Sequence, residues 1–120
     1  MARTPMIAMA AVLACATAVD AHPRLQSANP APSGVVLVAP TAVRLHFSEA
    51  LIGRFSTLRL SDSAGRPVPT GPSALDPRDH HTLAAPIPSR LARGRYTVNW
   101  RVVSVDTPRV QGRYGFTVSR

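Results

Sequence analysis

The sequence predicts an all-β fold, a Greek-key β-sandwich or barrel of the immunoglobulin-like or cupredoxin-like kind. Apolar and polar residues alternate along several short runs, which is typical of strands that turn one face toward a core. Turn-forming residues separate these runs at the spacing of a sandwich. No stretch is long and amphipathic enough to predict a stable helix.

Four runs carry the alternation. The first covers residues 43–47 and the second residues 58–60, both with apolar side chains at every other position. The third covers residues 96–103 and includes Trp100, which we expect in the core. The last covers residues 113–118, where aromatic and aliphatic residues again alternate with small or polar ones. Alternation with a period of two places one side of each strand in the interior.

The connecting segments are rich in glycine, proline, serine and asparagine. Three of them have the composition of turns, residues 29–34, 61–65 and 71–73. Residues 66–88 are the least patterned part of the chain and predict a long loop with one short strand near residues 82–84. Residues 88–93 favour a single helical turn, which Gly94 ends.

Residues 1–21 have the features of a secretory signal peptide. Arg3 supplies a positive charge, and residues 5–18 form an apolar run that is too short to span a bilayer. Small residues precede a cleavage point after Ala21. Cleavage there leaves one domain, residues 22–120, in a periplasmic or extracytoplasmic location.

Cleavage after Ala21 makes His22 the first residue, with a free α-amine beside its imidazole. Two neutral nitrogen donors on one residue form a chelate for a metal ion. The single cysteine, Cys15, lies in the leader, so packing stabilises the mature domain without a disulfide. A competing interpretation is lipid attachment at Cys15, in which case His22 is internal and lacks the free amine.

The formal net charge is +8, and every basic side chain is an arginine. The arginines are spread along the chain and form no block, so a nucleic-acid groove is not indicated. Contact with an anionic membrane surface or cell-surface polymer is the interaction that this charge favours.

Several motifs in order resemble the copper-resistance CopC family. They are His22 after Ala21, the sequence Leu-Gln-Ser-Ala-Asn-Pro-Ala-Pro-Ser-Gly at residues 25–34, and the runs 43–49, 94–106 and 112–118. The resemblance covers essentially the whole mature chain. It implies a periplasmic Greek-key β-barrel that binds copper and often works beside a membrane protein, CopD, which moves copper inward.

The resemblance also implies a Cu(II) site. Its donors would be the amine and ring of His22, the carboxylate of Asp106 in the loop before the last strand, and Glu49 nearby. Nitrogen and oxygen donors of this kind suit the tetragonal geometry of Cu(II). Pro23 has no backbone N–H, so the peptide after His22 cannot be deprotonated to wrap the metal, and the remaining donors must come from elsewhere in the fold.

The chain departs from the family pattern after Asp106. The family carries a histidine two residues after this aspartate, whereas here Pro108 stands in that place and Arg109 follows with a permanent positive charge. Some family members bind Cu(I) through a methionine-rich loop. The three methionines here, Met1, Met6 and Met9, all belong to the predicted leader, so no Cu(I) methionine site is expected.

Other histidines also offer donors. His80 and His81 follow Asp79 and form a reasonable donor cluster for Cu(II), Zn(II) or Ni(II), although a solvated start to a strand is the simpler interpretation. His46 alternates with the apolar residues of its strand, which predicts a surface side chain.

Three functions compete. The first is an exported protein that binds Cu(II) through His22 and serves copper resistance, homeostasis or delivery to a CopD-like membrane transporter. The second is a CopC-like domain without tight metal binding, which docks a membrane partner. The third is a copper enzyme. The chain shows neither the second in-plane histidine of oxidative copper sites nor a nucleophile and base arrangement, so it is not expected to be an enzyme.

Overall fold

The computed structural model of the chain describes residues 22–106 and 109–120. The predicted leader, with Cys15 and the cleavage point after Ala21, lies outside the described residues, as does Pro108. In order, the elements are β1 (Leu25–Asn29), β2 (Val35–Val36), β3 (Ala42–Phe47), the 3₁₀ helix η1 (Gly53–Phe55), β4 (Thr57–Asp62), β5 (Pro67–Val68), β6 (Ala74–Asp76), β7 (Asp79–Pro86), β8 (Gly94–Val102) and β9 (Val110–Val118).

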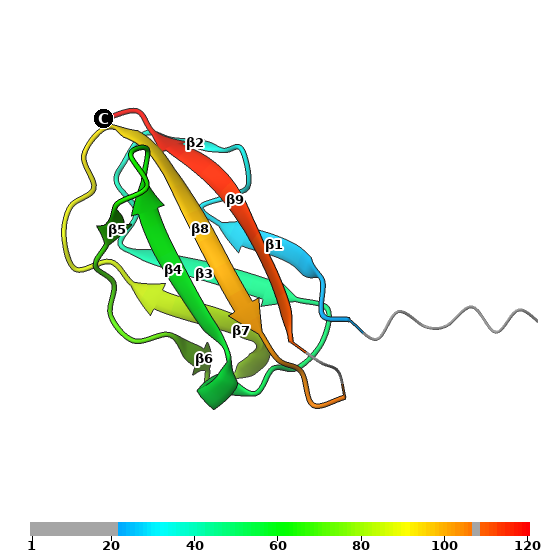
Figure 1. Ribbon diagram of the computed structural model, residues 1–120. Helices are drawn as coiled ribbons and strands as arrows, with labels where there is room; N and C mark the ends of the chain where they lie inside the picture. The colour runs from blue at the N-terminus through cyan, green and yellow to red at the C-terminus, as the bar shows by residue number, and fades with distance from the viewer. Residues whose placement is uncertain (1–21, 107–108) are drawn as a thin grey trace, which may run out of the picture.

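The strands form two sheets packed face to face (Figure 1). One has four strands in the order β1-β3-β7-β6, and the other has five in the order β2-β9-β8-β4-β5. Every pair is antiparallel except β2 with β9, which is parallel. The predicted all-β sandwich is confirmed. Within the described part of the chain, no helix is long and apolar enough to cross a membrane.

The core fills the space between the two sheets. It is built from the side of each strand that the alternating pattern predicts, chiefly Val43, Leu45 and Phe47 of β3, Leu58 and Leu60 of β4, Tyr96, Val98 and Val102 of β8, and Tyr114, Phe116 and Val118 of β9. Burial of this apolar surface is the main stabilising contribution available, because the described residues include no cysteine.

Aromatic rings close one end of the core. Trp100 on β8 packs edge-on against Phe47, with ring centroids 6.1 Å apart, and lies 6.0 Å from the ring of Tyr114. The hydroxyl of Tyr114 donates a hydrogen bond of 2.7 Å to the backbone carbonyl of Pro30, and burial raises the pKa of Tyr114. The expected core position of Trp100 is therefore confirmed in part, because its side chain is only partly buried.

The prediction of a long loop at residues 66–88 is wrong, whereas the short strand predicted near residues 82–84 is confirmed and lies within β7. This segment contains β5, β6 and the eight-residue β7, which pairs with β3 in the centre of its sheet. The first half of β7 is polar, and Thr82 and Leu83 are buried in succession, so the period-two signal is absent where the strand begins. The strand forms because β3 supplies a hydrogen-bonding partner, which the sequence pattern does not show.

Other local expectations also fail. Residues 88–93 form no helical turn, whereas η1 at Gly53–Phe55 was not predicted. The polar strand β1 was not predicted either, since its residues lack apolar alternation. Edge strands such as β1 bury little surface and so carry a weak sequence signal.

We predict that Gly112→Ala destabilises the fold by about 1–3 kcal/mol, the usual cost of overpacking. Gly112 lies opposite Trp100 in the ladder, and a β-carbon there would overlap the indole ring. Gly115→Ala on the same strand is the matched control, because its β-carbon would meet only ordinary contacts, the nearest at 3.5 Å. Urea unfolding of both variants measures the difference. Equal stabilities would contradict the packing described for Trp100.

Candidate metal centre

The N-terminal segment is attached to the residues that follow β3. The backbone N–H of Ser48 donates to the carbonyl of Arg24 at 2.8 Å, and the N–H of Arg24 donates to the hydroxyl of Ser48 at 2.8 Å. His22 lies two residues before Arg24, and Glu49 is the residue after Ser48. The structure therefore brings the segments carrying these two predicted ligands side by side.

Residues 48–56, which we call the crossing segment, run from β3 in one sheet to β4 in the other. Leu51 forms an isolated antiparallel bridge with Ser104, and the N–H of Ile52 donates to the carbonyl of Val103 at 2.8 Å. Asp106 lies two residues beyond Ser104. The third predicted ligand thus leaves the sandwich from the same end as the first two.

Ser56 fixes the far end of the crossing segment. Its hydroxyl is almost fully buried, donates to the carbonyl of Ile52 at 2.9 Å, and accepts from the N–H of Val103 at 3.1 Å. Because this buried hydroxyl both donates and accepts a hydrogen bond, it holds the crossing segment against the end of β8. The backbone around Glu49 is consequently held on both sides, by the N-terminal segment and by the end of β8.

The side chains of the three predicted ligands do not form a completed donor set. His22 and Asp106 are exposed and Glu49 is half-buried. Among residues 22–106 and 109–120, no three or more histidine, cysteine, aspartate or glutamate side chains are grouped closely enough to hold a metal ion. The backbone therefore brings together the segments that carry the three predicted ligands, but their side-chain donor atoms do not converge on one point.

Near this end lies a histidine cluster formed by His46, Asp79, His81 and Thr82. The sequence indicated Asp79 and His81 as donors, but not that His46 and Thr82 join them. The Nδ1 of His46 is 3.0 Å from the hydroxyl of Thr82 and 3.1 Å from a carboxylate oxygen of Asp79. The two imidazole rings stack with centroids 5.8 Å apart. His46 is a partly exposed surface residue, as predicted, with 38% of its side chain accessible, and it gains a polar partner because the pairing of β3 with β7 sets Thr82 directly opposite it.

The cluster is held by hydrogen bonds that use one nitrogen of each ring. His81 contacts the backbone carbonyl of Phe47 through Nδ1 at 3.0 Å, so both rings keep Nε2 for other partners. Metal-binding histidines are commonly oriented in this way. Two rings alone are a smaller donor set than the sites that hold metal tightly. His80 is exposed, whereas its neighbour His81 is half-buried.

Asp79 organises the cluster. One carboxylate oxygen accepts from the Thr82 hydroxyl at 2.8 Å and the other from the backbone N–H of His81 at 3.0 Å. These two bonds, with smaller contributions from the nearby imidazoles of His46 and His81, lower the pKa of Asp79 below its ordinary value. The carboxylate is therefore stabilised in its ionised form at the start of β7.

Comparison with known proteins identifies relatives over nearly the whole described chain. The CopC domain family model matches residues 25–119. Copper resistance protein C of Pseudomonas syringae pv. tomato is 36% identical over 104 residues, covering 82% of each protein. Protein YobA of Escherichia coli strain K12 is 36% identical over 98 residues, covering 82% of this chain and 79% of YobA.

Solved structures agree with the sequence matches. CopC from Methylosinus trichosporium OB3b superposes with a TM-score of 0.76 at 32% identity, covering 82% of this chain and 94% of that protein. PcoC, a methionine-rich copper resistance protein from Escherichia coli, gives a TM-score of 0.75 at 34% identity, with 82% of this chain and all of PcoC covered. This chain differs from PcoC in composition, since its three methionines are Met1, Met6 and Met9.

We predict that Asp79→Asn lowers the free energy of unfolding at neutral pH. The variant should also lose less of this free energy than the wild type when the pH falls. A carboxylate whose pKa is lowered by folding stabilises the protein above its unfolded pKa of 3.8, and this stabilisation is lost as the pH falls through the lower folded value. Urea unfolding of the wild type and variant at pH 7 and pH 3 tests this. The difference between them should shrink at pH 3, and an equal difference at both pH values would contradict the prediction.

Proposed function

The chain is a member of the CopC family, and from that premise we propose that it is an exported copper-binding protein that takes up Cu(II) through His22. Copper is its cargo, and copper resistance, homeostasis or delivery to a membrane transporter is its role. The family membership supports copper handling, since relatives with the same fold are copper resistance proteins. The observation that carries the site is the pair of hydrogen-bonded contacts from the crossing segment to Arg24 and to Val103.

The proposed donors are the amine and ring of His22 with the carboxylates of Asp106 and Glu49. Two nitrogens and one or two oxygens suit Cu(II), and no thiolate or thioether is needed. Glu49 sits on the held backbone of the crossing segment, whereas His22 and Asp106 are exposed and lie on its two flanks. Cu(II) would draw these two flanking donors toward the fixed one.

Protons compete with Cu(II) for the amine and the imidazole of His22. Binding therefore weakens on acidification, because both nitrogens must be neutral to coordinate. The +8 net charge adds a repulsion that the donor atoms have to overcome. With one imidazole instead of the family's two, the affinity is expected to be lower than in members that keep the second histidine. Because the chain has no methionine after residue 9, we do not propose a Cu(I) site with methionine ligands.

A CopD-like membrane transporter is the proposed partner, and catalysis is not part of the proposed role. Two large apolar side chains lie exposed at the site end, Phe55 at the end of η1 and Val105 beside Asp106, with 54% and 69% of their surface accessible. The guanidinium carbon of Arg54 lies 4.8 Å from the ring centroid of Phe55. Apolar side chains beside a metal site offer a contact for a receiving protein.

The second candidate is a family member that docks a partner without tight metal binding. The exposed, separate positions of His22 and Asp106 favour it, as does the lack of a group of three donors among the described residues. Pro108 favours it too, because a proline has no donor where the family has an imidazole. Copper titration of the correctly processed chain separates the two functions.

We predict that mature protein beginning at His22 binds Cu(II) more tightly than a free His-Pro peptide. Acetylation of the α-amine, which is the only amine of the mature protein because the chain has no lysine, should weaken binding by at least about tenfold, or about 1.4 kcal/mol, because it removes one of the two nitrogen donors of His22. Isothermal titration at neutral pH measures both affinities, and intact mass confirms the first residue and its acetylation. An unchanged affinity in the acetylated protein would rule out the N-terminal chelate and direct attention to His46 and His81.

We predict that Pro108→His tightens Cu(II) binding by about tenfold or more, or about 1.4 kcal/mol, by restoring an imidazole two residues after Asp106. Pro108→Ala is the control for any change in loop backbone, and it should leave the affinity near that of the wild type. A competition titration with a copper chelator measures the three proteins. If the histidine and alanine variants bind alike, residue 108 does not reach the metal.

A further inference from the structure

The outward face of the five-stranded sheet carries an array of arginines. Because buried and exposed residues alternate along β4, β8 and β9, the polar side of these strands faces solvent. We define the arginine face by Arg59 on β4, Arg95 and Arg101 on β8, and Arg113 on β9, all of them exposed. In the sequence these residues are separated by up to 54 positions, so only the sheet brings them together.

The strand register sets how the arginines are spaced. Arg59 pairs with Asn99 and Asn99 pairs with Arg113, so the two arginines flank one asparagine across three strands. With strands about 4.8 Å apart and residues about 3.3 Å apart along a strand, the array is about 10 Å wide and about 20 Å long from Arg95 to Arg101. One small anion cannot contact all four side chains at once.

The face lacks negative charge to balance the arginines. Its remaining outward positions on β4, β8 and β9 are uncharged, namely Thr57, Ser61, Thr97, Asn99, Gln111, Gly115 and Thr117. In the part of the chain that the structure describes, no ion pair joins any of the four arginines to a carboxylate. Asp62 lies at the rim, but its oxygens accept from the backbone of Ala64 and Arg66 and pair with the Arg66 guanidinium at 3.3 Å.

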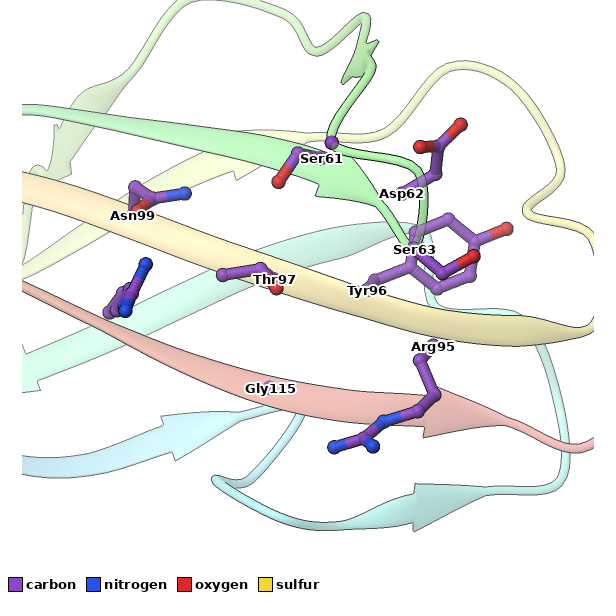
Figure 2. Close-up of a pocket in the computed structure, with 10 residues that line it drawn as sticks. Ser61, Asp62, Ser63, Arg95, Tyr96, Thr97, Asn99 and Gly115 are labelled. Atoms are coloured by element: carbon purple, nitrogen blue, oxygen red, sulfur yellow. The ribbon is translucent and has the colours of Figure 1, made fainter.

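A shallow hollow lies within the face (Figure 2). Gly115 contributes no side chain to it, and the Arg95 guanidinium approaches to 4.0 Å from the place where a β-carbon would stand. The hollow has a volume of about 430 Å³, and Thr97, Asn99 and Arg113 also line it. Hydroxyl, amide and guanidinium donors line this open recess together with the carboxylate of Asp62, which is paired with Arg66. An anionic group can approach the guanidinium groups of Arg95 and Arg113 there.

We infer that the arginine face is a docking surface for an anionic phospholipid bilayer. A sheet face with several separated guanidinium groups matches an array of phosphates, each of which an arginine can bind through two hydrogen bonds. The outward positions hold no large apolar or aromatic side chain, so the face lacks the anchors that usually dominate a protein interface. Attraction of several cationic side chains to anionic lipid needs no such anchor.

This inference is independent of copper binding, since the arginine face and the crossing segment are different parts of the surface. The net charge favours contact with an anionic membrane, and the inference names the arginine face as the surface that makes this contact. Each arginine near an anionic membrane contributes about a fivefold gain in binding. The loss of two arginines should therefore weaken binding by well over tenfold.

The test is sedimentation of the mature protein with vesicles of phosphatidylcholine alone or mixed with phosphatidylglycerol, at low and high salt. The variant Arg59→Gln with Arg113→Gln removes two charges from the face. The variant Arg54→Gln with Arg78→Gln removes two exposed charges elsewhere and so has the same net charge. Urea unfolding checks that both variants keep wild-type stability, as expected for exposed side chains.

We expect salt-sensitive binding to the mixed vesicles only, a loss of about tenfold or more in the face variant, and a much smaller loss in the control. Equal losses in the two variants would show that net charge alone acts, and would overturn the proposal. Absence of binding at low salt would overturn it as well. Binding to soluble polyglutamate but not to the mixed vesicles would assign the face to an acidic protein segment instead of a lipid surface.

Discussion

The crossing segment is the feature on which the candidate site depends. It carries the chain from one sheet to the other, and three of its backbone N–H groups, those of Ser48, Leu51 and Ile52, donate to the carbonyls of Arg24, His80 and Val103. A connection of this length without such bonds would expose or bury unpaired backbone groups. Because the three neighbours belong to the N-terminal segment, β7 and the end of β8, one set of hydrogen bonds determines where three separate parts of the chain meet.

The aromatic end of the core supports this meeting point from inside. Phe47 is the last residue of β3 and packs on Trp100, while its carbonyl contacts His81. The described domain includes no cysteine, so this packing and the Tyr114 bond to Pro30 do the work that disulfides perform in many small exported domains. The proposed ligands His22 and Asp106 are exposed outside this packed end of the sandwich, so binding of a metal by them would not require the core to change.

The sequence predicted the part of the fold that rests on alternation. Strands β3, β4, β8 and β9 bury one face each, and their apolar side chains identify them. β1 was not predicted, and only residues 82–84 of β7 were, because pairing with β3, and not their own composition, makes these segments strands. The same limit applies to function. His22, Glu49 and Asp106 were found through family motifs, whereas the histidine cluster depends on the register of His46 with Thr82, which no motif encodes.

Register also explains why the arginines looked scattered. Arg59 and Arg113 are 54 residues apart in the sequence and two strands apart in the sheet. The proposed copper site and the arginine face have opposite electrostatic requirements, because arginine attracts phosphate and repels Cu(II). Screening by salt weakens lipid binding and also weakens the repulsion between the protein and Cu(II). Binding to a membrane would reduce the same repulsion between the protein and Cu(II), because anionic lipid phosphates neutralise the arginine face. Docking on lipid would thus lower the electrostatic cost of bringing Cu(II) to the exposed end of the sandwich, so the two proposed interactions assist each other although they share no residue.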